Sequence, residues 1–303
     1  MTTLDLRAGR KSQWFAVADA LRVHQWVKNL LVFVPVLLDH KISDPAVLWK
    51  ASVAFAAFCC AASGAYMMND LLDREADRRH PTKRHRPFAA ETLSPVFGMV
   101  TVPLLFLGAL LGSLWLSPKF IALLTMYVLV TTAYSVYLKQ IAVVDVLVLA
   151  GLYTLRVMAG VAASHVRFST WLLAFSMFLF LSLAFLKRYA ELTQLQGGPE
   201  EVIPRRGYLR GDREWLASMG GASGYISVLV LALYINSDQV MALYNRPMLL
   251  WLVCPLLLLW VSRMWLLAHR GQIHQDPIVA AVRDPASYAI GAMVAVILYV
   301  AVQ

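Results

Sequence analysis

The chain has 303 residues, of which 59% are hydrophobic and only 15% are charged, and its formal net charge is +9. A soluble globular domain carries about 25% charged residues, so this composition argues against an ordinary soluble protein. The three cysteines, Cys59, Cys60 and Cys254, lie in apolar segments without the spacing of a zinc site or a disulfide framework.

The hydrophobic residues form nine segments, each of which we expect to cross a membrane as a helix. A membrane helix needs about 20 apolar residues to span a hydrocarbon core of about 30 Å. The first segment is short and contains Pro35, so it is the weakest candidate for a full span. We therefore predict an all-α integral membrane protein, with 1–303 as a single transmembrane domain. The segments cover residues 27–38, 47–70, 93–116, 119–138, 143–164, 170–191, 217–236, 248–268 and 285–302.

The basic residues fall mostly in alternate loops, which predicts an orientation. Of the 27 Lys and Arg, one lies within a span and only five fall on the opposite side, namely Lys41, Lys50, Lys119, Arg167 and Arg246. Loops rich in Lys and Arg stay in the cytoplasm, so we predict a cytoplasmic N-terminus and an outer C-terminus. Residues 1–26 are polar and basic, without the apolar core of a cleavable signal, and we expect them to lie at the cytoplasmic interface. A basic face also binds anionic lipid headgroups, and we expect no nucleic-acid partner.

The most informative motif ends the second segment, where Asn69, Asp73 and Asp77 follow one another at intervals of four residues. Positions four apart share one face of a helix, so with Asp70 they form a polar stripe. Carboxylates near the end of a membrane helix are costly unless a cation meets them. Mg²⁺ takes one or two carboxylates and completes its shell with water and substrate phosphate. We predict Mg²⁺ binding at Asn69, Asp70, Asp73 and Asp77; a helix end with solvated charges is the alternative.

A turn rich in cations follows this stripe. Lys83, Arg84 and Arg86 come directly after Pro81, which we expect to end the helix. Cations beside a metal site are typical of enzymes that hold a polyphosphate and neutralise the charge of the leaving group.

A second polar cluster joins the fourth and fifth segments and includes Tyr134, Lys139 and Asp145. Lys139 can meet a phosphate, and Asp145 can serve as a metal ligand, as a base or as a partner of Lys139. An interfacial anchor made of Tyr and Lys explains the same pattern.

A third polar cluster, Lys187, Arg188 and Glu191, ends the sixth segment. Cations at a helix C-terminus also complement the helix dipole, which is the structural alternative. What favours function is that the second, fourth and sixth segments all end in polar clusters on the same predicted side.

Other polar residues give weaker signals. Lys28 and Asn29 open the first segment and can reach a phosphate or anchor the interface. Arg156 lies deep in the fifth segment, where an arginine needs a partner or a polar cavity, and a structural ion pair is an equal alternative. Residues 269–277 can form a lid over the site, although turn and capping roles explain them better.

With the Asn-x3-Asp-x3-Asp motif at the end of the second of nine helices, the chain resembles the UbiA superfamily of intramembrane prenyltransferases. The resemblance implies a ring of helices around a chamber that opens to the cytoplasm and sideways to lipid. It also implies two Asp-rich motifs, ending helices two and six, that bind a prenyl diphosphate through Mg²⁺. Metal binding is carried over to Asn69, Asp73 and Asp77.

The end of the sixth segment departs from that family pattern, because Lys187-Arg188-Tyr189-Ala190-Glu191 stands where the second Asp-rich motif is usual. Together with residues 24–29 and 77–87, it resembles the decaprenyl-phosphate phosphoribosyltransferase branch. That branch implies transfer of 5-phosphoribosyl from 5-phosphoribosyl 1-diphosphate to a polyprenyl phosphate in the cytoplasmic membrane, and a role in making an arabinose donor.

We accordingly expect two sets of site residues. The catalytic set is Asn69, Asp73, Asp77 and Lys139. The substrate-binding set is Lys28, Asn29, Lys83, Arg84, Arg86, Tyr134, Asp145, Arg156, Lys187, Arg188 and Glu191.

Two other functions stay open. An ordinary UbiA-type enzyme joins a polyprenyl diphosphate to an aromatic acceptor, but it needs a second acidic motif that this chain lacks. A transporter also carries polar residues in its spans, but here the polar clusters gather at one predicted face and no inverted repeat is evident. The sequence leaves open the length of the lipid and whether the chain forms a homo-oligomer.

Overall fold

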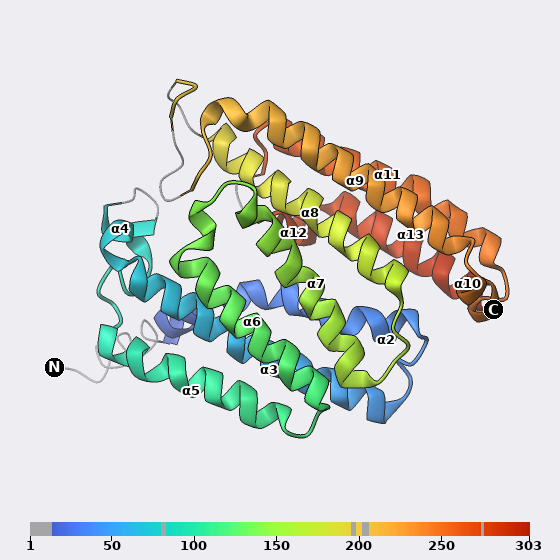
Figure 1. The fold of residues 1–303 in the computed structure, drawn as a ribbon, viewed down its shortest axis with the longest axis horizontal. Coiled ribbons are helices and arrows are strands. Elements are labelled where there is room, and N and C mark those ends of the chain that lie inside the picture. The colour runs from blue at the N-terminus through green and yellow to red at the C-terminus, as the bar shows by residue number, and fades with distance from the viewer. Residues whose placement is uncertain (1–13, 80–82, 195–197, 202–205, 274–275) are drawn as a thin grey trace, which may run out of the picture. The chain divides into compact units, whose positions relative to one another are not determined.

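The computed structural model describes residues 14–79, 83–194, 198–201, 206–273 and 276–303, and the secondary-structure elements in these ranges are all helices. The chain divides into two compact units. Unit 1 comprises Met1–Val136 and Leu155–Arg167, and unit 2 comprises Tyr137–Thr154 and Phe168–Gln303. Helix α7, Val144–Ser164, passes from unit 2 into unit 1 at Leu155 (Figure 1). That the chain forms a single domain stays a prediction.

The prediction of an all-helical membrane protein is confirmed. Eight of the described helices are long and apolar enough to cross a membrane, and a ninth span results if one bent pair of helices is counted. The predicted segments match these helices closely. Two of these helices begin several residues from the predicted start: α9 begins at Arg213 rather than at residue 217, and α11 begins at Val253 rather than at residue 248, after the 3₁₀-helix Pro247–Leu252.

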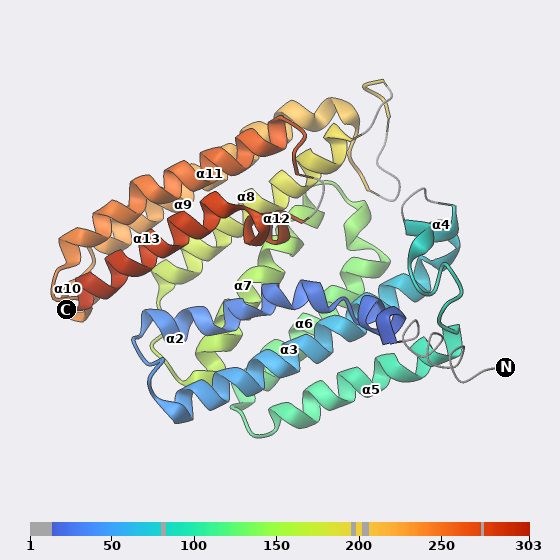
Figure 2. The ribbon, with the colours of Figure 1, turned by 180° about the vertical axis from the view of Figure 1, so that it is seen from behind.

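Unit 1 is built from three long helices that run side by side, together with shorter pieces (Figures 1 and 2). Its elements are η1 Val23–Phe33, α2 Val34–Leu38, α3 Pro45–Leu72, α4 Arg74–Arg78, η2 Lys83–His85, α5 Pro95–Ser113, α6 Pro118–Val136 and the second half of α7.

Unit 2 packs α8, α9, α11 and α13 against one another, with short helices between them (Figure 2). Its elements are η3 Leu138–Gln140, the first half of α7, α8 Thr170–Thr193, η4 Arg210–Asp212, α9 Arg213–Ile235, α10 Asp238–Leu243, η5 Pro247–Leu252, α11 Val253–His269, α12 Pro277–Arg283 and α13 Pro285–Val302.

Local capping chemistry fixes where several of these helices begin. Asp44 precedes α3, and its Oδ1 accepts hydrogen bonds from the backbone N of Ala46 at 2.9 Å and of Val47 at 3.3 Å. Ser169 and Asp284 cap α8 and α13 in the same way. Because such caps satisfy backbone N–H groups that have no partner inside the helix, polar residues at these positions start helices even in a hydrophobic chain.

The first predicted segment differs most from the structure. A helix at Trp14–Leu21 is followed, after a bend of 42°, by the helices that end at Leu38. Arg22 at the bend has a left-handed backbone, with φ of 51°. Residues Val23–Phe33 form a 3₁₀-helix, and Pro35 lies in the first turn of α2, where proline is tolerated because that N–H needs no helical partner.

Very close helix packing holds η1 against α7 inside unit 1. A Cβ placed on Gly160 would lie 2.1 Å from the carbonyl oxygen of Val32. Membrane helices pack closely through such small residues, because lipid gives no hydrophobic driving force between helices. Glycine at position 160 therefore sets how closely the first segment approaches α7.

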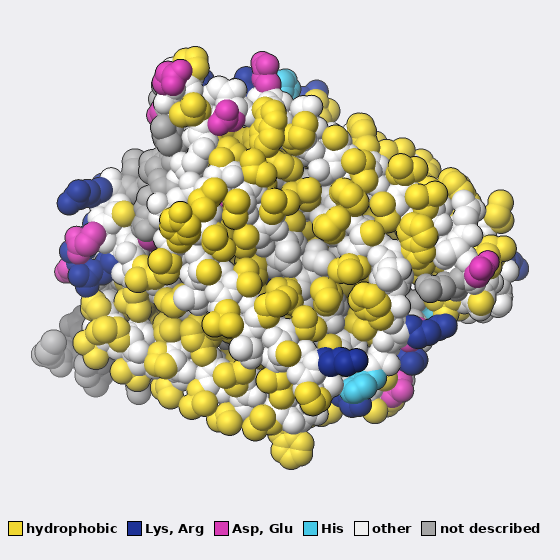
Figure 3. All heavy atoms as spheres, in the orientation of Figure 1, with side chains coloured by type: hydrophobic (Ala, Val, Ile, Leu, Met, Phe, Trp, Pro, Cys, Tyr) yellow, Lys and Arg dark blue, Asp and Glu magenta, His cyan; other side chains and the backbone are white. Residues whose placement is uncertain are grey.

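Hydrophobic side chains cover the outward faces of the long helices. Figure 3 shows them over α5 and α6 of unit 1 and over α8 and α9 of unit 2, with charged side chains near the helix ends. On α5, for example, Leu104 is 60% exposed and Leu111 is 53% exposed. Large exposed apolar patches mark contact with a membrane or with another protein, and on helices long enough to span a bilayer this surface fits lipid.

Candidate active site

The Asn-x3-Asp-x3-Asp motif forms one continuous stripe in unit 1, although α3 ends at Leu72 and α4 begins at Arg74. The backbone N of Asp73 donates to the oxygen of Asn69 at 2.9 Å, and the N of Asp77 donates to the oxygen of Asp73 at 2.8 Å. These bonds keep the i, i+4, i+8 register across the junction, so the three side chains share a face. Asn69 and Asp73 are half-buried and Asp77 is buried.

Arg86, in the cationic turn, is hydrogen-bonded to this stripe. Its Nη1 donates to Oδ2 of Asp77 at 2.7 Å and to Oδ1 of Asp70 at 3.0 Å. Asp70 also accepts a hydrogen bond of 2.6 Å from Nη2 of Arg22, whose guanidinium lies 5.0 Å from the ring centroid of Tyr66. Asp70, which we expected on the metal stripe, thus has two arginine partners, Arg22 and Arg86.

The donor atoms of the stripe fit Mg²⁺. Asn69, Asp73 and Asp77 offer one amide oxygen and two carboxylates, which are the hard ligands that this ion prefers. Among the described residues, no three His, Cys, Asp or Glu side chains are grouped closely enough to form a metal site by themselves. A stripe with two carboxylates agrees with an ion that takes its other ligands from water and substrate phosphate.

The rest of the cationic turn is open to solvent. Lys83 and Arg84, on η2, are exposed, whereas Arg86 is half-buried. Pro81, which we expected to end the helix, lies outside the described residues; α4 ends at Arg78.

Unit 2 contains a buried network centred on Arg188, near the end of α8. The Nε of Arg188 donates to Oδ2 of Asp145, and its Nη1 donates to Oε2 of Glu191. Oδ1 of Asp145 accepts from the hydroxyl of Tyr208 at 2.7 Å. The side chains of Arg188 and Asp145 have no exposed area. Asp145, for which we considered a metal, base or Lys139-pairing role, has Arg188 and Tyr208 as partners.

Backbone strain accompanies this network. Val143 has φ of 68°, a conformation that is rare for a β-branched residue and is typically found at functional sites. Its backbone N donates to the hydroxyl of Tyr208 at 2.8 Å. Burial raises the pKa of Tyr208, and the neighbouring carboxylate of Asp145 raises it further, so the phenol stays protonated and continues to donate.

Close backbone contact explains how the loop of Tyr208 reaches this network. A Cβ on Gly207 would lie 2.7 Å from the backbone N of Ala142 and from the carbonyl oxygen of Gln140. Lys139, which precedes Gln140 in the chain, is buried. Its carbonyl oxygen accepts a long hydrogen bond of 3.4 Å from Nη1 of Arg206. The turn after η3 and this loop are therefore packed backbone to backbone.

Lys187 takes part in a second polar network in unit 2, which is centred on Asp276. Its Nζ lies 3.4 Å from Oδ2 of Asp276, which also accepts from the hydroxyl of Tyr153 at 3.3 Å. Asp276 in turn caps α12, its Oδ1 accepting from the N of Ile278 at 3.2 Å. Asp276 therefore has the capping role that we expected for residues 269–277; residues 274–275 lie outside the described residues.

Arg156 forms a buried polar site in unit 1. Its Nε donates to Oδ1 of Asn29 at 2.9 Å, its Nη2 donates to the hydroxyl of Tyr127 at 2.9 Å, and its guanidinium stacks 4.8 Å above the Tyr127 ring. Asn29 also donates to Sγ of Cys59 at 3.3 Å. The arginine thus has the polar partners that we expected a buried arginine to need, and in these bonds they are an amide and a phenol rather than a carboxylate. Lys28 is buried, and Tyr134 is half-buried on α6.

Sequence reasoning missed the tyrosines of these networks. Tyr208, Tyr153 and Tyr127 each bind a charged side chain that lies between 29 and 123 residues away. A hydroxyl that meets its partner through the fold leaves no local spacing pattern. The one available signal for Tyr208 was its place in a long polar loop.

Comparison with known proteins places the chain in a family. The model of the UbiA prenyltransferase family matches residues 30–278. An uncharacterized protein y4nM from Sinorhizobium fredii is 39% identical over 91% of this chain, which spans only 54% of that protein. Nodulation protein NoeC from Azorhizobium caulinodans is 37% identical over 91% of this chain and 90% of its own length.

Part of the chain is also similar to a named transferase. The decaprenyl-phosphate phosphoribosyltransferase of Mycolicibacterium smegmatis is 39% identical over 179 residues, which are 57% of this chain and 56% of that protein. Among solved structures, a UbiA homolog from Archaeoglobus fulgidus bound to DMAPP and Mg²⁺ superposes with a TM-score of 0.71 at 15% identity, over 94% of this chain and 99% of that one. The fold, the motif and the family match agree: this chain belongs to the UbiA prenyltransferase family of membrane-embedded transferases.

Proposed function

We propose that the protein transfers a 5-phosphoribosyl group from 5-phosphoribosyl 1-diphosphate to a polyprenyl phosphate and releases diphosphate. The observation that carries the proposal is the network around Arg188. Asp145 and Glu191 are both bound to this arginine, at the point where an ordinary prenyltransferase of the family is expected to bind a second metal through acidic residues. The partial match to decaprenyl-phosphate phosphoribosyltransferases supports the same substrates.

The number of cations also fits these substrates. The donor carries a diphosphate and a separate 5-phosphate, and the acceptor carries a third phosphate group. We assign phosphate binding to cations of all the polar clusters: Lys28, Lys83, Arg84, Arg86, Lys139 and Lys187. Cations that are positioned before the reaction stabilise developing negative charge without further reorganisation. A single prenyl diphosphate needs fewer of them.

Asn69, Asp73 and Asp77 would hold Mg²⁺. When bound, the ion would act as a Lewis acid and would neutralise negative charge on the diphosphate. Arg86 keeps Asp77 oriented by its 2.7 Å hydrogen bond and adds a cation next to the leaving group. Arg188, which is fully buried, is a positioning residue that fixes Asp145 and Glu191.

No side chain needs to act as a general base. A phosphate oxygen of the lipid attacks C1 of the ribose while the bond from C1 to the diphosphate oxygen breaks. The lipid phosphate is already ionised near neutral pH, so no proton has to be removed from the nucleophile. The task of the protein is to bind and orient three phosphate groups and to exclude water.

The second candidate is transfer of a prenyl group from its diphosphate to an aromatic acceptor. It is favoured by the structural likeness to UbiA homologs that were solved with GPP or DMAPP and Mg²⁺. These likenesses are 15% identical, so they support the fold and the use of a divalent metal more than the choice of substrate.

A transfer assay separates the two candidates. The purified chain in detergent receives labelled 5-phosphoribosyl 1-diphosphate, decaprenyl phosphate and Mg²⁺, with and without EDTA. We expect label in the lipid phase only with free Mg²⁺, and none with Asp73→Asn. Asp238→Asn, at the exposed start of α10, is the matched control and should keep wild-type turnover. Product from a prenyl diphosphate and an aromatic acid, without ribosyl transfer, would instead establish the second candidate.

A further inference from the structure

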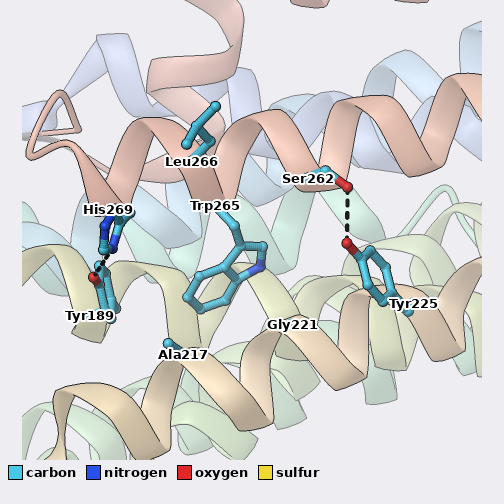
Figure 4. Close-up of a pocket in the computed structure, with 8 residues that line it drawn as sticks. All are labelled: Tyr189, Ala217, Gly221, Tyr225, Ser262, Trp265, Leu266 and His269. Atoms are coloured by element: carbon cyan, nitrogen blue, oxygen red, sulfur yellow. Dashed lines mark hydrogen bonds between the residues drawn. The ribbon is translucent and has the colours of Figure 1, made fainter.

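Unit 2 carries a trough that none of the polar networks uses. It lies between α9 and α11, has a volume of about 370 Å³ and is lined by Tyr189, Ala217, Gly221, Tyr225, Ser262, Trp265, Leu266 and His269 (Figure 4). Pockets that bind small molecules have volumes of about 300–1,000 Å³. Tyr225 is 53% exposed and Leu266 is 46% exposed, so the trough opens outward on the hydrophobic surface of the helices.

The floor of the trough is shaped for a narrow apolar chain. Ala217, Gly221 and Tyr225 recur every four residues along one face of α9. A Cβ placed on Gly221 would meet no heavy atom within 4 Å, so open space lies directly above this glycine. At 1.5 Å per residue, the floor from Ala217 to Tyr225 is about 12 Å long. This length is close to one leaflet of the hydrocarbon core, which is about 15 Å.

The wall of the trough is rigid. The ring of Trp265 lies between Tyr189 and Gly221 in Figure 4, and its Nε1 donates to Oγ of Ser182 at 3.1 Å. A Cβ placed on Gly220 would lie 2.2 Å from this ring, so the ring packs directly against the backbone of α9 at Gly220. The trough is therefore a preformed feature of the helix pair.

One end of the trough is cationic and lies where the membrane helices end. There the hydroxyl of Tyr189 is hydrogen-bonded to Nδ1 of His269 at 3.1 Å, and the guanidinium of Arg213 lies 6.0 Å from the centroid of the Tyr189 ring. Arg270 follows His269 and is exposed. The acidic residues Asp212 and Glu214 flank Arg213 at the start of α9. The described basic residues at this end are Arg210, Arg213 and Arg270, so one net positive charge remains.

We propose that this trough binds one anionic phospholipid, with an acyl chain along Ala217 and Gly221 and the phosphate at the end formed by Arg213, His269 and Arg270. The assignment rests on charge complementarity at one end and on an apolar floor one leaflet long. Basic pockets at the ends of membrane helices are known to select anionic headgroups. Since Tyr189 adjoins Arg188 in α8, a bound lipid would also stabilise the helix end that carries the Arg188 network.

Native mass spectrometry of the full chain tests the proposal with two probes, phosphatidylglycerol and phosphatidylcholine of the same acyl chains. We expect the wild type to retain phosphatidylglycerol about tenfold more strongly, given the cations at the headgroup position. Gly221→Leu fills the trough and should abolish this binding. Gly291→Leu, on α13, where a Cβ also meets nothing within 4 Å, is the matched control and should bind like the wild type.

Arg213→Gln gives a second measurement that does not alter the floor. It should remove the preference for phosphatidylglycerol while the apparent melting temperature without added lipid stays unchanged. Equal retention of the two lipids by the wild type would overturn the proposal, and so would wild-type retention by Gly221→Leu. Displacement of phosphatidylglycerol by an equimolar polyprenyl phosphate would assign the trough to the substrate lipid and overturn it as well. None of these results depends on transferase activity.

Discussion

Tyr208 donates a hydrogen bond of 2.7 Å to Oδ1 of Asp145, from a loop that lies 63 residues further along the chain. The same hydroxyl accepts a hydrogen bond from the strained backbone of Val143. One side chain thus links the loop after α8 to the start of α7. It also completes the shell of a fully buried carboxylate whose other oxygen is bound by Arg188.

We expect Tyr208→Phe to lower stability by about 1–3 kcal/mol, because it leaves a buried carboxylate oxygen and a backbone N–H without this hydroxyl. The apparent melting temperature of the detergent-solubilised chain measures the loss. Tyr299→Phe on α13, where the side chain is 68% exposed, is the control and should melt like the wild type. Equal melting of the two variants would show that the Tyr208 hydroxyl contributes nothing to stability.

The buried pair of Asp145 and Arg188 should show strong coupling in a double-mutant cycle. Either Asp145→Asn or Arg188→Met alone leaves a charge without its partner in a buried site, which typically costs about 3–5 kcal/mol. The double variant removes both charges, so its loss should be clearly smaller than the sum of the single losses. Additive losses would contradict a direct interaction between the two side chains.

Arg86→Gln should impair use of the phosphoribosyl donor. The substitution removes the 2.7 Å bond to Asp77 and the 3.0 Å bond to Asp70, and charge-assisted bonds of this kind contribute about 1.5–3 kcal/mol. We expect the KM for the donor to rise about 10- to 100-fold, which is the same free energy expressed as a ratio. Steady-state kinetics with Arg79→Gln, an exposed arginine on the same segment, provides the control.

Two glycines of α7 should respond in opposite directions to alanine. Gly160→Ala places a methyl group 2.1 Å from the oxygen of Val32, and overpacking of this kind costs about 1–3 kcal/mol. Gly151→Ala meets nothing within 4 Å and should stabilise the helix, since glycine is up to about 1 kcal/mol less favourable than alanine in a helix. Melting temperatures on either side of the wild type would confirm the expectation; a stabilised Gly160→Ala would refute it.

Asp284 should make stability depend on pH in the acid range. The hydrogen bond from Arg263 lowers the pKa of Asp284 from 3.8 to about 2, and bonds from Ser287 add to this against the opposing effect of burial. A lowered pKa means that the folded protein binds the proton less readily than the unfolded chain. The stabilisation is therefore complete above pH of about 4 and is lost as the pH falls through about 2.

Thermal unfolding between pH 5 and pH 2 tests this expectation. Asp284→Asn can still cap α13, where Asp284 accepts from the N of Ser287 at 2.9 Å, but it has no charge to titrate. The wild type should lose more stability than this variant over the interval. Parallel curves would show that the bond to Arg263 does not affect the folding equilibrium.

The sequence by itself determined the class of fold and most helix limits. Long apolar runs can satisfy their backbone polar groups in a bilayer only as helices, so nine such runs predicted the helices that the structure contains. The i, i+4 spacing of Asn69, Asp73 and Asp77 likewise determined the shared face, because helical geometry alone fixes it. The first segment was predicted less well, since Pro35 and the left-handed Arg22 break the regular helix on which the length argument depends.

Only the tertiary structure decided which charged groups meet. Spacing placed Asp70 near the metal stripe, but the fold brings Arg22 and Arg86 to it from 48 and 16 residues away. Asp145 meets Arg188 and Tyr208 for the same reason. The sequence fixes which residues share a helix face, whereas hydrogen-bond partners depend on helix packing and on loops that close over long separations along the chain. The pairing of these charged groups follows from the packing of the whole chain, so no local sequence pattern could have revealed it.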